Sequence, residues 1–211
     1  MTRADDITDA LRQDILRGRF EPGDRLLEVA LAEHYDVGRA AIRSSLVALT
    51  AEGLVVREAN RGATVRRISI TEAIQITEAR SALESLIASR AAENSTESTH
   101  AELRQIIADM EIAADTNARD YSELNARLHG CLRAMSGHHI AASLVANLRD
   151  RAAHHQYRLA LMPGRPHESL EQHRRIVDAV IAGDAEEAGR AMAEHLSSVT
   201  EVLRRWSDAT P

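Results

Sequence analysis

The stretch VGRAAIRSSL, residues 37–46, places two arginines four positions apart directly after a glycine. Residues four apart lie on the same face of a helix, so Arg39 and Arg43 would form a basic edge on a helix that begins at Arg39. No acidic residue lies between Arg39 and Glu52. We therefore expect a polyanion outside the chain to supply the negative charge that this edge faces.

The flanking sequence predicts a winged helix-turn-helix around this stretch. Apolar residues recur with helical spacing, which predicts helices over residues 5–18, 26–35 and 39–52. The short segment Asp36–Gly38 suits the tight turn between the second helix and the third. Two β-prone segments, residues 54–57 and 63–67, flank a turn that contains glycine and predict a hairpin, the wing.

In a helix-turn-helix, the second helix of the pair enters the major groove of DNA, and its first residues contact base edges. The guanidinium groups of Arg39 and Arg43 can bond the O6 and N7 atoms of guanine. The hydroxyls of Ser44 and Ser45 can reach phosphates, and the tip of the wing fits a minor groove or the backbone. We expect six residues to contact DNA: Arg39, Ala40, Arg43, Ser44, Arg61 and Gly62.

The charge distribution agrees with a single face that meets a polyanion. Residues 37–67 hold six arginines against two acidic residues, whereas residues 68–211 hold 15 arginines against 21 acidic residues. One short basic segment on an otherwise acidic protein is typical of a DNA-binding face. By charge alone, a chance fluctuation of surface charge remains the alternative.

Composition excludes several classes of protein. The chain has no run of 18 apolar residues, so we expect no membrane span. The single cysteine, Cys131, cannot form an internal disulfide, and the N-terminus lacks a secretory pattern, so we expect a cytoplasmic protein. Only five aromatic residues are present, which argues against a stacking platform for single-stranded nucleic acid.

Beyond the wing, every periodic segment has helical spacing. The sequence Ser-Ile-Thr-Glu at residues 69–72 matches a capping box and marks the start of a second domain. The pattern predicts helices over residues 71–93, 98–114, 118–136, 138–161, 167–182 and 184–206. The predicted fold is mainly α, with a winged helix-turn-helix over residues 1–68 followed by an all-α bundle of about six helices over residues 69–211.

Histidines in this second domain are spaced so that three of them can meet. Asn125 and His129 lie one turn apart on one helix face. His173 and His195 flank the predicted helical hairpin at Gly183, and antiparallel packing of its two helices brings them together. A third helix alongside would add His129, which is how helix bundles build metal sites. Interior histidines without a metal are the alternative.

The chain resembles a known family in both halves. Residues 22–65, PGDRLLEVALAEHYDVGRAAIRSSLVALTAEGLVVREANRGATV, resemble the winged-helix domain of GntR-family bacterial transcription regulators. The recognition segment keeps Val37, Arg39, Arg43 and Leu46 of the family pattern. It departs from that pattern at Gly38, Ala40, Ala41, Ser44 and Ser45. Residues 79–92, 125–137 and 171–196 resemble the all-α ligand-sensing domain of the FadR-type subfamily.

The resemblance implies a metal site. Many members of this subfamily bind a divalent metal through one aspartate and three histidines, which match Asn125, His129, His173 and His195 here. Asn125 stands where the family usually has aspartate, and its neutral amide is a weaker ligand than a carboxylate. Because the three imidazoles are also neutral, no ligand would offset the positive charge of the ion. The bound ion would therefore favour an anionic effector. Zinc is the metal expected from the ligand types, with nickel or manganese as alternatives.

The resemblance also implies a position for the effector. Arg80 matches a family position that often faces the ligand, where a guanidinium can clamp a carboxylate. The alternative is an ordinary surface ion pair between Arg80 and Glu84, one helical turn apart.

The function expected from these features is a ligand-responsive transcription regulator, specifically a repressor. It would act as a homodimer on palindromic operator DNA, because two recognition helices related by two-fold symmetry read such a site. A small carboxylate would be its effector. Two alternatives remain: a metal-free sensor of a bulkier acyl ligand, and a metalloenzyme built on the histidine cluster. No acidic residue is clearly placed as a general base, so we expect no catalysis.

Overall fold

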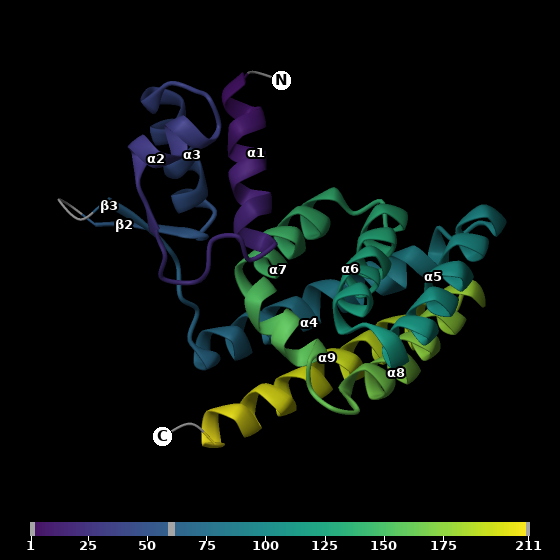
Figure 1. Ribbon diagram of the computed structural model, residues 1–211. Coiled ribbons are helices and arrows are strands. Elements are labelled where there is room, and N and C mark those ends of the chain that lie inside the picture. Colours follow the sequence, from purple (N-terminus) through teal and green to yellow (C-terminus); the bar gives the residue numbers. More distant parts are fainter. Residues whose placement is uncertain (1–2, 59–61, 210–211) are drawn as a thin grey trace. The chain divides into compact units, whose positions relative to one another are not determined.

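The computed structural model describes residues 3–58 and 62–209, and the chain divides into two compact units, Met1–Ser69 and Ile70–Pro211 (Figure 1). The first unit consists of α1 (Arg3–Leu16), β1 (Arg25–Leu26), α2 (Glu28–His34), α3 (Arg39–Ala51), β2 (Val55–Glu58) and β3 (Gly62–Val65). This is the predicted winged helix-turn-helix, and α3 begins at the predicted residue.

The wing is a three-stranded sheet rather than a simple hairpin. Strands β2 and β3 pair antiparallel, with Val55 opposite Val65. The two residues of β1 pair with the other edge of β3, which gives the strand order β1-β3-β2. The predictions missed β1 because two residues carry no periodicity that could reveal a strand.

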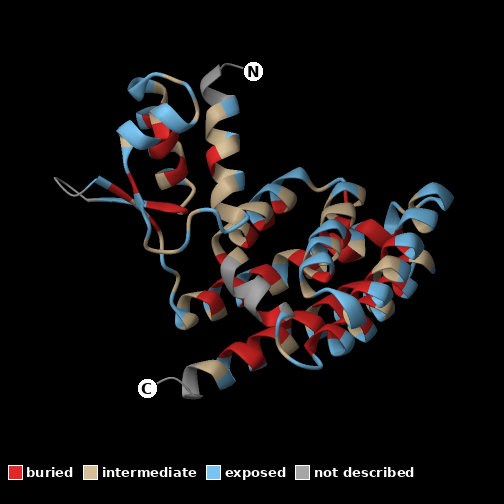
Figure 2. Ribbon diagram, viewed as in Figure 1, coloured by how far each residue is buried: buried red, intermediate tan, exposed pale blue. Residues whose placement is uncertain are grey.

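The core of the first unit fixes the exposed face of α3. Ile42, Leu46 and Leu49 of α3 are fully buried, and they pack in one cluster with Leu11 of α1 and Leu31 of α2. Because these side chains hold one face of α3 in the core, the opposite face of the helix stays in solvent (Figure 2).

The second unit is the predicted all-α bundle. Its helices are α4 (Ile70–Glu93), α5 (Glu97–Thr116), α6 (Ala118–Met135), α7 (His139–Ala160), α8 (Arg165–Ile181) and α9 (Ala185–Ala209). Helix α8 begins two residues earlier than expected, which brings Arg165 and Pro166 into its first turn. Within the described ranges, none of the helices is long and apolar enough to cross a membrane.

Helices α4 and α9 lie side by side over much of their length and form the centre of the bundle (Figure 1). Gly189 of α9 allows this close approach, because a Cβ atom at this position would lie 2.5 Å from the Oγ atom of Ser89 on α4. Helices α8 and α9 form the predicted hairpin, and Gly183 turns the chain between them with a φ of +71°. This hairpin carries two of the three candidate histidine ligands.

Candidate metal centre and nucleic-acid interface

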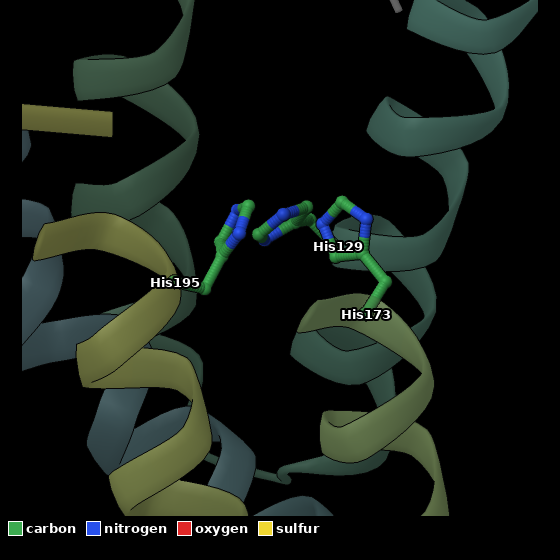
Figure 3. A group of neighbouring side chains, drawn as sticks. All are labelled: His129, His173 and His195. Carbon is green, nitrogen blue, oxygen red and sulfur yellow. The ribbon is translucent and has the colours of Figure 1, made fainter. Parts of the chain in front are cut away.

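Three buried histidines from three helices converge in the second unit. His129 lies on α6, His173 on α8 and His195 on α9, and their exposed fractions are 2, 0 and 4 %. One ring nitrogen of each histidine lies within 4.8 Å of those of the other two. The rings of His173 and His195 are 4.4 Å apart between centroids, and both lie beside the ring of His129 (Figure 3). The convergence predicted from helical spacing is therefore present.

Hydrogen bonds at Nδ1 set the tautomers of two of these histidines. The Nδ1 atom of His129 lies 2.5 Å from a carboxylate oxygen of Glu84, and that of His195 lies 2.9 Å from the amide oxygen of Gln172. Both partners accept hydrogen bonds through these oxygens, so each Nδ1 carries the proton and donates. The Nε2 atoms of His129 and His195 are then left with free lone pairs, which is the form that binds metals.

Two further polar atoms are buried beside this cluster with unused bonding capacity. The Nε2 atom of His173 and the Oδ1 atom of Asn125 have no hydrogen-bond partner among the residues that the structure describes. Leaving a buried acceptor unsatisfied costs about 1–3 kcal/mol. A cation bound between these atoms would satisfy both, so the residues present fit a divalent metal.

The protonation states agree with a metal site. Burial lowers the pKa of His129 to about 4, even though the charge of Glu84 opposes this shift. Burial, together with the neighbouring histidines, also lowers the pKa of His173 and of His195 well below the ordinary value. All three imidazoles are therefore neutral near pH 7, as ligation requires.

A buried network of charged groups supports His129 from α4 and α7. The Nε atom of Arg80 donates to Glu84 at 2.7 Å, and the Nη1 atom of Arg149 lies 3.9 Å from the same carboxylate. Arg80 and Glu84 are 3 % and 1 % exposed, so the interpretation of this pair as a surface ion pair is wrong. Burial favours a neutral Glu84, but the charge of Arg80 and the hydrogen bond from His129 outweigh this effect and hold the pKa of Glu84 well below the usual range.

A pocket opens beside the histidines, and its atom-free space is about 510 Å³, including the part open to solvent. Its polar lining consists mainly of Arg80, Asn125, His129, Arg149, Arg165 and His195. Leu159, Leu196 and Val199 form an apolar wall. Arg80 thus lines the pocket, as the resemblance implied. A partly open cavity lined by a few buried cations suits a small anionic molecule.

The candidate DNA-contacting arginines lie on the exposed face of α3, and both side chains are more than half exposed. Arg43 forms a two-point ion pair with Glu28 of α2, with N–O distances of 2.8 and 3.2 Å, and Arg39 lies 4.0 Å from the same carboxylate. The hydrogen bonds from Arg43 lower the pKa of Glu28. Helix α2 thus supplies one negative charge beside this edge, which the sequence did not reveal.

The other residues expected at the DNA interface differ in their exposure. Ala40 and Ser44 are exposed on α3, whereas Ser45 is fully buried and accepts a hydrogen bond from Thr8 of α1 at 2.9 Å. The expectation that Ser45 reaches a phosphate is thus wrong. Gly62 is exposed at the start of β3 with a φ of +85°, and Arg61 lies outside the described residues.

The sequence did not reveal the roles of four residues in the second unit: Glu84, Arg149, Arg165 and Gln172. The spacing of Arg80 and Glu84 indicated a pair but not its burial, because helix α4 shows little amphipathic contrast along its length. Gln172 precedes His173 directly, yet its partner is His195 on the next helix. Such contacts depend on how neighbouring helices pack, which local spacing does not encode.

Comparison with known proteins agrees with both units. The sequence profile of the FCD domain matches residues 75–198, and that of bacterial regulatory proteins of the gntR family matches residues 3–65. The chain is 29 % identical to the HTH-type transcriptional repressor RspR of Escherichia coli (strain K12) over 196 residues, which span 92 % of this chain and 86 % of the relative.

Two further relatives have similar coverage. The HTH-type transcriptional repressor GlaR of Escherichia coli (strain K12) is 26 % identical and covers 92 % of this chain and 93 % of its own length. The HTH-type transcriptional regulator LutR of Bacillus subtilis (strain 168) is 29 % identical, with coverage of 90 % and 95 %. These relatives and families are transcription regulators, not enzymes.

Solved structures share the fold. Escherichia coli McbR/YncC aligns with a TM-score of 0.84 at 21 % identity and covers 98 % of this chain and 99 % of that chain. A transcriptional regulator from Rhodococcus sp. RHA1 aligns with a TM-score of 0.76 at 22 % identity, with coverage of 96 % and 98 %. At this level of sequence identity, the two structural similarities show only that the fold is shared.

Proposed function

Because the chain belongs to the GntR family of bacterial regulatory proteins and carries an FCD domain, it is a transcription regulator, and we propose that a small carboxylate controls it through a divalent metal in the all-α unit. The metal would be held by Asn125, His129, His173 and His195. The observation that carries this proposal is the unused bonding capacity of buried acceptor atoms around the cluster.

The donor set determines the charge that an effector meets. Three neutral imidazoles and one neutral amide leave the charge of a divalent ion uncompensated within its ligand set. When bound, the ion would act as a Lewis acid for an anionic group. Arg80 and Arg149 add two cations to the pocket, and Glu84 returns one negative charge. The pocket therefore favours an anionic effector, and zinc suits three imidazoles as ligands.

The first unit would bind operator DNA through α3 and the wing. Arg39, Ala40, Arg43 and Ser44 lie exposed on α3, and Gly62 lies on the wing next to Arg61. We expect a homodimer that reads a palindromic site in the cytoplasm, because two-fold symmetry matches two recognition helices to two half-sites. Repression is the expected action, and two of the relatives, RspR and GlaR, are named repressors.

The pocket lining favours this proposal over a sensor of a bulky acyl ligand. Three arginines of the pocket, Arg80, Arg149 and Arg165, are each less than 8 % exposed and share only two carboxylates, those of Glu84 and Glu168, so an uncharged acyl chain would leave one positive charge in excess. Burying an unpaired cation costs several kcal/mol. A short acid both fits the space and supplies the missing charge.

Metal content per chain tests the proposal. Protein purified without a nickel column is dialysed against zinc, nickel or manganese and then analysed by elemental mass spectrometry. We expect one metal ion per chain in the natural protein and none in His173→Ala. His139→Ala, which removes an exposed histidine at the start of α7, is the control and should retain the ion. Protein that takes up none of the three metals would contradict the proposal.

A further inference from the structure

Arg165, at the first position of α8, is bonded on one side and unsatisfied on the other. Its side chain is 6 % exposed. The Nη1 atom donates to the hydroxyl of Ser198 at 2.7 Å and lies 3.1 Å from a carboxylate oxygen of Glu168. The Nη2 atom is buried and has no hydrogen-bond partner among the residues described by the structure. The guanidinium is therefore fixed in place while half of its donor capacity remains unused.

The surroundings of Arg165 leave its charge poorly compensated. The carboxylate of Glu168 is 56 % exposed and therefore largely hydrated, which weakens its attraction for a buried cation. Helix α8 begins after Gly164, which offers no side-chain cap, so the helix adds the partial positive charge of its N-terminus. Arg165, Pro166 and Ser169 of this first turn line the pocket. An anion in the pocket would satisfy the Nη2 donor at this point.

This position is separate from the network that supports the histidines. Arg80 and Arg149 both face Glu84, whereas Arg165 faces Glu168. On α8, Arg165 precedes His173 by eight residues, which is about 12 Å along the helix axis at 1.5 Å per residue. The pocket thus holds cations on two sets of helices, Arg80 and Arg149 on α4 and α7 and Arg165 at the start of α8. The apolar wall lines the same pocket.

We propose that the effector is a short dicarboxylate. One carboxylate would lie at the histidine cluster and Arg80, and the second would accept hydrogen bonds from the Nη2 atom of Arg165. The planar guanidinium suits a carboxylate, and Leu159, Leu196 and Val199 would contact the carbon chain between the two charges. This inference rests on the proposed function and specifies the class of acid that the pocket selects.

Pairs of acids with equal carbon number test the proposal. Isothermal titration calorimetry compares succinate with butyrate, and glutarate with valerate, on the full-length protein after loading with zinc. We expect the dicarboxylate of at least one pair to bind tighter by about tenfold or more, the contribution of a charge-assisted hydrogen bond. Inorganic phosphate serves as a third ligand and should bind more weakly than the preferred dicarboxylate.

Variants on α8 locate the selectivity. Arg165→Gln should bring the ratio of the two affinities close to one, and Arg165→Lys, which keeps the charge, should retain part of the ratio. Arg175→Gln removes an exposed arginine from the same helix and should leave the ratio unchanged. The fluorescence of Trp206, the only tryptophan, reports whether each variant is folded.

The outcomes separate this inference from the proposed function. If the natural protein binds the dicarboxylate and the monocarboxylate of each pair with equal affinity, the inference is overturned. A preference for the dicarboxylate that persists in Arg165→Gln overturns it as well. Tighter binding of phosphate would assign the pocket to a phosphate ester and overturn it as well. If Arg165→Gln does not fold, the affinity ratios of the natural protein and of Arg165→Lys still test the inference. Absence of binding by every acid would contradict both the proposed function and this inference. Equal binding of the paired acids would contradict the inference alone.

Discussion

Asn125 is the proposed ligand that would set how strongly the metal site binds its ion. Its amide oxygen is buried and faces no hydrogen-bond partner in the described part of the chain. It stands where the subfamily pattern has an aspartate, so the ligand set is neutral. A neutral amide oxygen attracts a divalent cation less than a carboxylate does. The proposed site would therefore bind its metal more weakly than a site with an aspartate, and the bound ion would attract an anionic effector more strongly.

Asn125→Asp should raise the affinity for zinc by at least about tenfold, or 1.4 kcal/mol, because it adds a negative charge to the ligand set. Competition with a chromogenic chelator measures the change. Asn117→Asp is the matched control: Asn117 caps α6, an aspartate caps a helix equally well, and the same charge is added on the same segment. Equal affinities of Asn125→Asp and the natural protein would show that Asn125 is not a ligand.

Arg43 is held in place before any DNA arrives. Its Nε and Nη2 atoms both contact the carboxylate of Glu28, which leaves Nη1 directed away from the pair. The bonds to Glu28 raise the pKa of Arg43 further, so the guanidinium stays charged at every relevant pH. The ion pair connects α2 and α3 and restricts the orientation of the side chain that we expect to read guanine.

Arg43→Ala should weaken binding to operator DNA by about 1–3 kcal/mol, the contribution of one good base contact. Fluorescence anisotropy on a duplex selected from random sequences measures the loss. Arg104→Ala, which removes an exposed arginine from α5, is the control and should bind as the natural protein does. Affinity for the selected duplex that is unaffected by Arg43→Ala would contradict the assignment of α3 as the recognition helix.

At the scale of helices, the pair α4 and α9 positions one side of the pocket, with Arg80 on α4 and His195, Leu196 and Val199 on α9. Arg80 and Glu84 project from α4, and His195 projects from α9. The two helices approach closely because Gly189 faces Ser85 and Ser89, and the hydroxyl of Ser89 donates to the carbonyl of Ala185 at 2.7 Å. A larger residue at 189 would push these helices apart and displace the groups they carry.

Gly189→Ala should destabilise the protein by about 1–2 kcal/mol, because the added methyl group meets the Oγ atom of Ser89 at 2.5 Å. In a Ser89→Ala background the same change should cost clearly less, because the main-chain oxygen of Ser85, at 3.3 Å, is then the nearest atom to the added methyl group. The oxygen is then gone, the nearest side-chain atom of residue 89 lies 3.8 Å away, and alanine favours the helix.

Urea unfolding of the four proteins in this double-mutant cycle gives the coupling energy. In the Ser89→Ala background, the cost of Gly189→Ala is the difference in unfolding free energy between the double variant and Ser89→Ala. This reference is needed because Ser89→Ala by itself removes the hydrogen bond to Ala185. An equal cost of Gly189→Ala in both backgrounds would show that α4 and α9 do not depend on this contact.

At the scale of the whole molecule, the metal would connect three helices of the all-α unit. Its proposed ligands come from α6, α8 and α9, and α4 contributes through Glu84 to the orientation of His129. A ligand that binds only the folded state stabilises that state by mass action. Metal binding should therefore change the stability of this unit as well as its affinity for an effector.

Removal of the metal should lower the thermal midpoint. At a zinc concentration about 100 times the dissociation constant, the bound state gains about 2.7 kcal/mol, which corresponds to about 5–10 °C for a unit of this size. Trp206 on α9 is the only tryptophan, so its fluorescence reports unfolding of the all-α unit. Midpoints that do not differ between zinc-loaded and chelated protein, or a shift that persists in His173→Ala, would contradict the site.

The sequence by itself determined the helices and their order, and it missed only the two-residue strand β1 among the described elements. Apolar residues at helical spacing predicted each helix of both units to within a few residues, because helical periodicity is a local property. The wing was predicted from two β-prone segments around glycine. The meeting of His173 and His195 followed from the geometry of a helical hairpin about Gly183, and helical spacing placed Asn125 one turn from His129.

Only the tertiary structure decided which charged groups face one another. Glu28 pairs with Arg43 across 15 residues, Glu84 with His129 across 45, and Arg165 with Ser198 across 33. Each contact depends on the rotation and separation of packed helices, which side-chain volumes across the whole core set together. The spacing of residues along one helix fixes the face on which a side chain lies, but the partner it meets depends on the neighbouring helix.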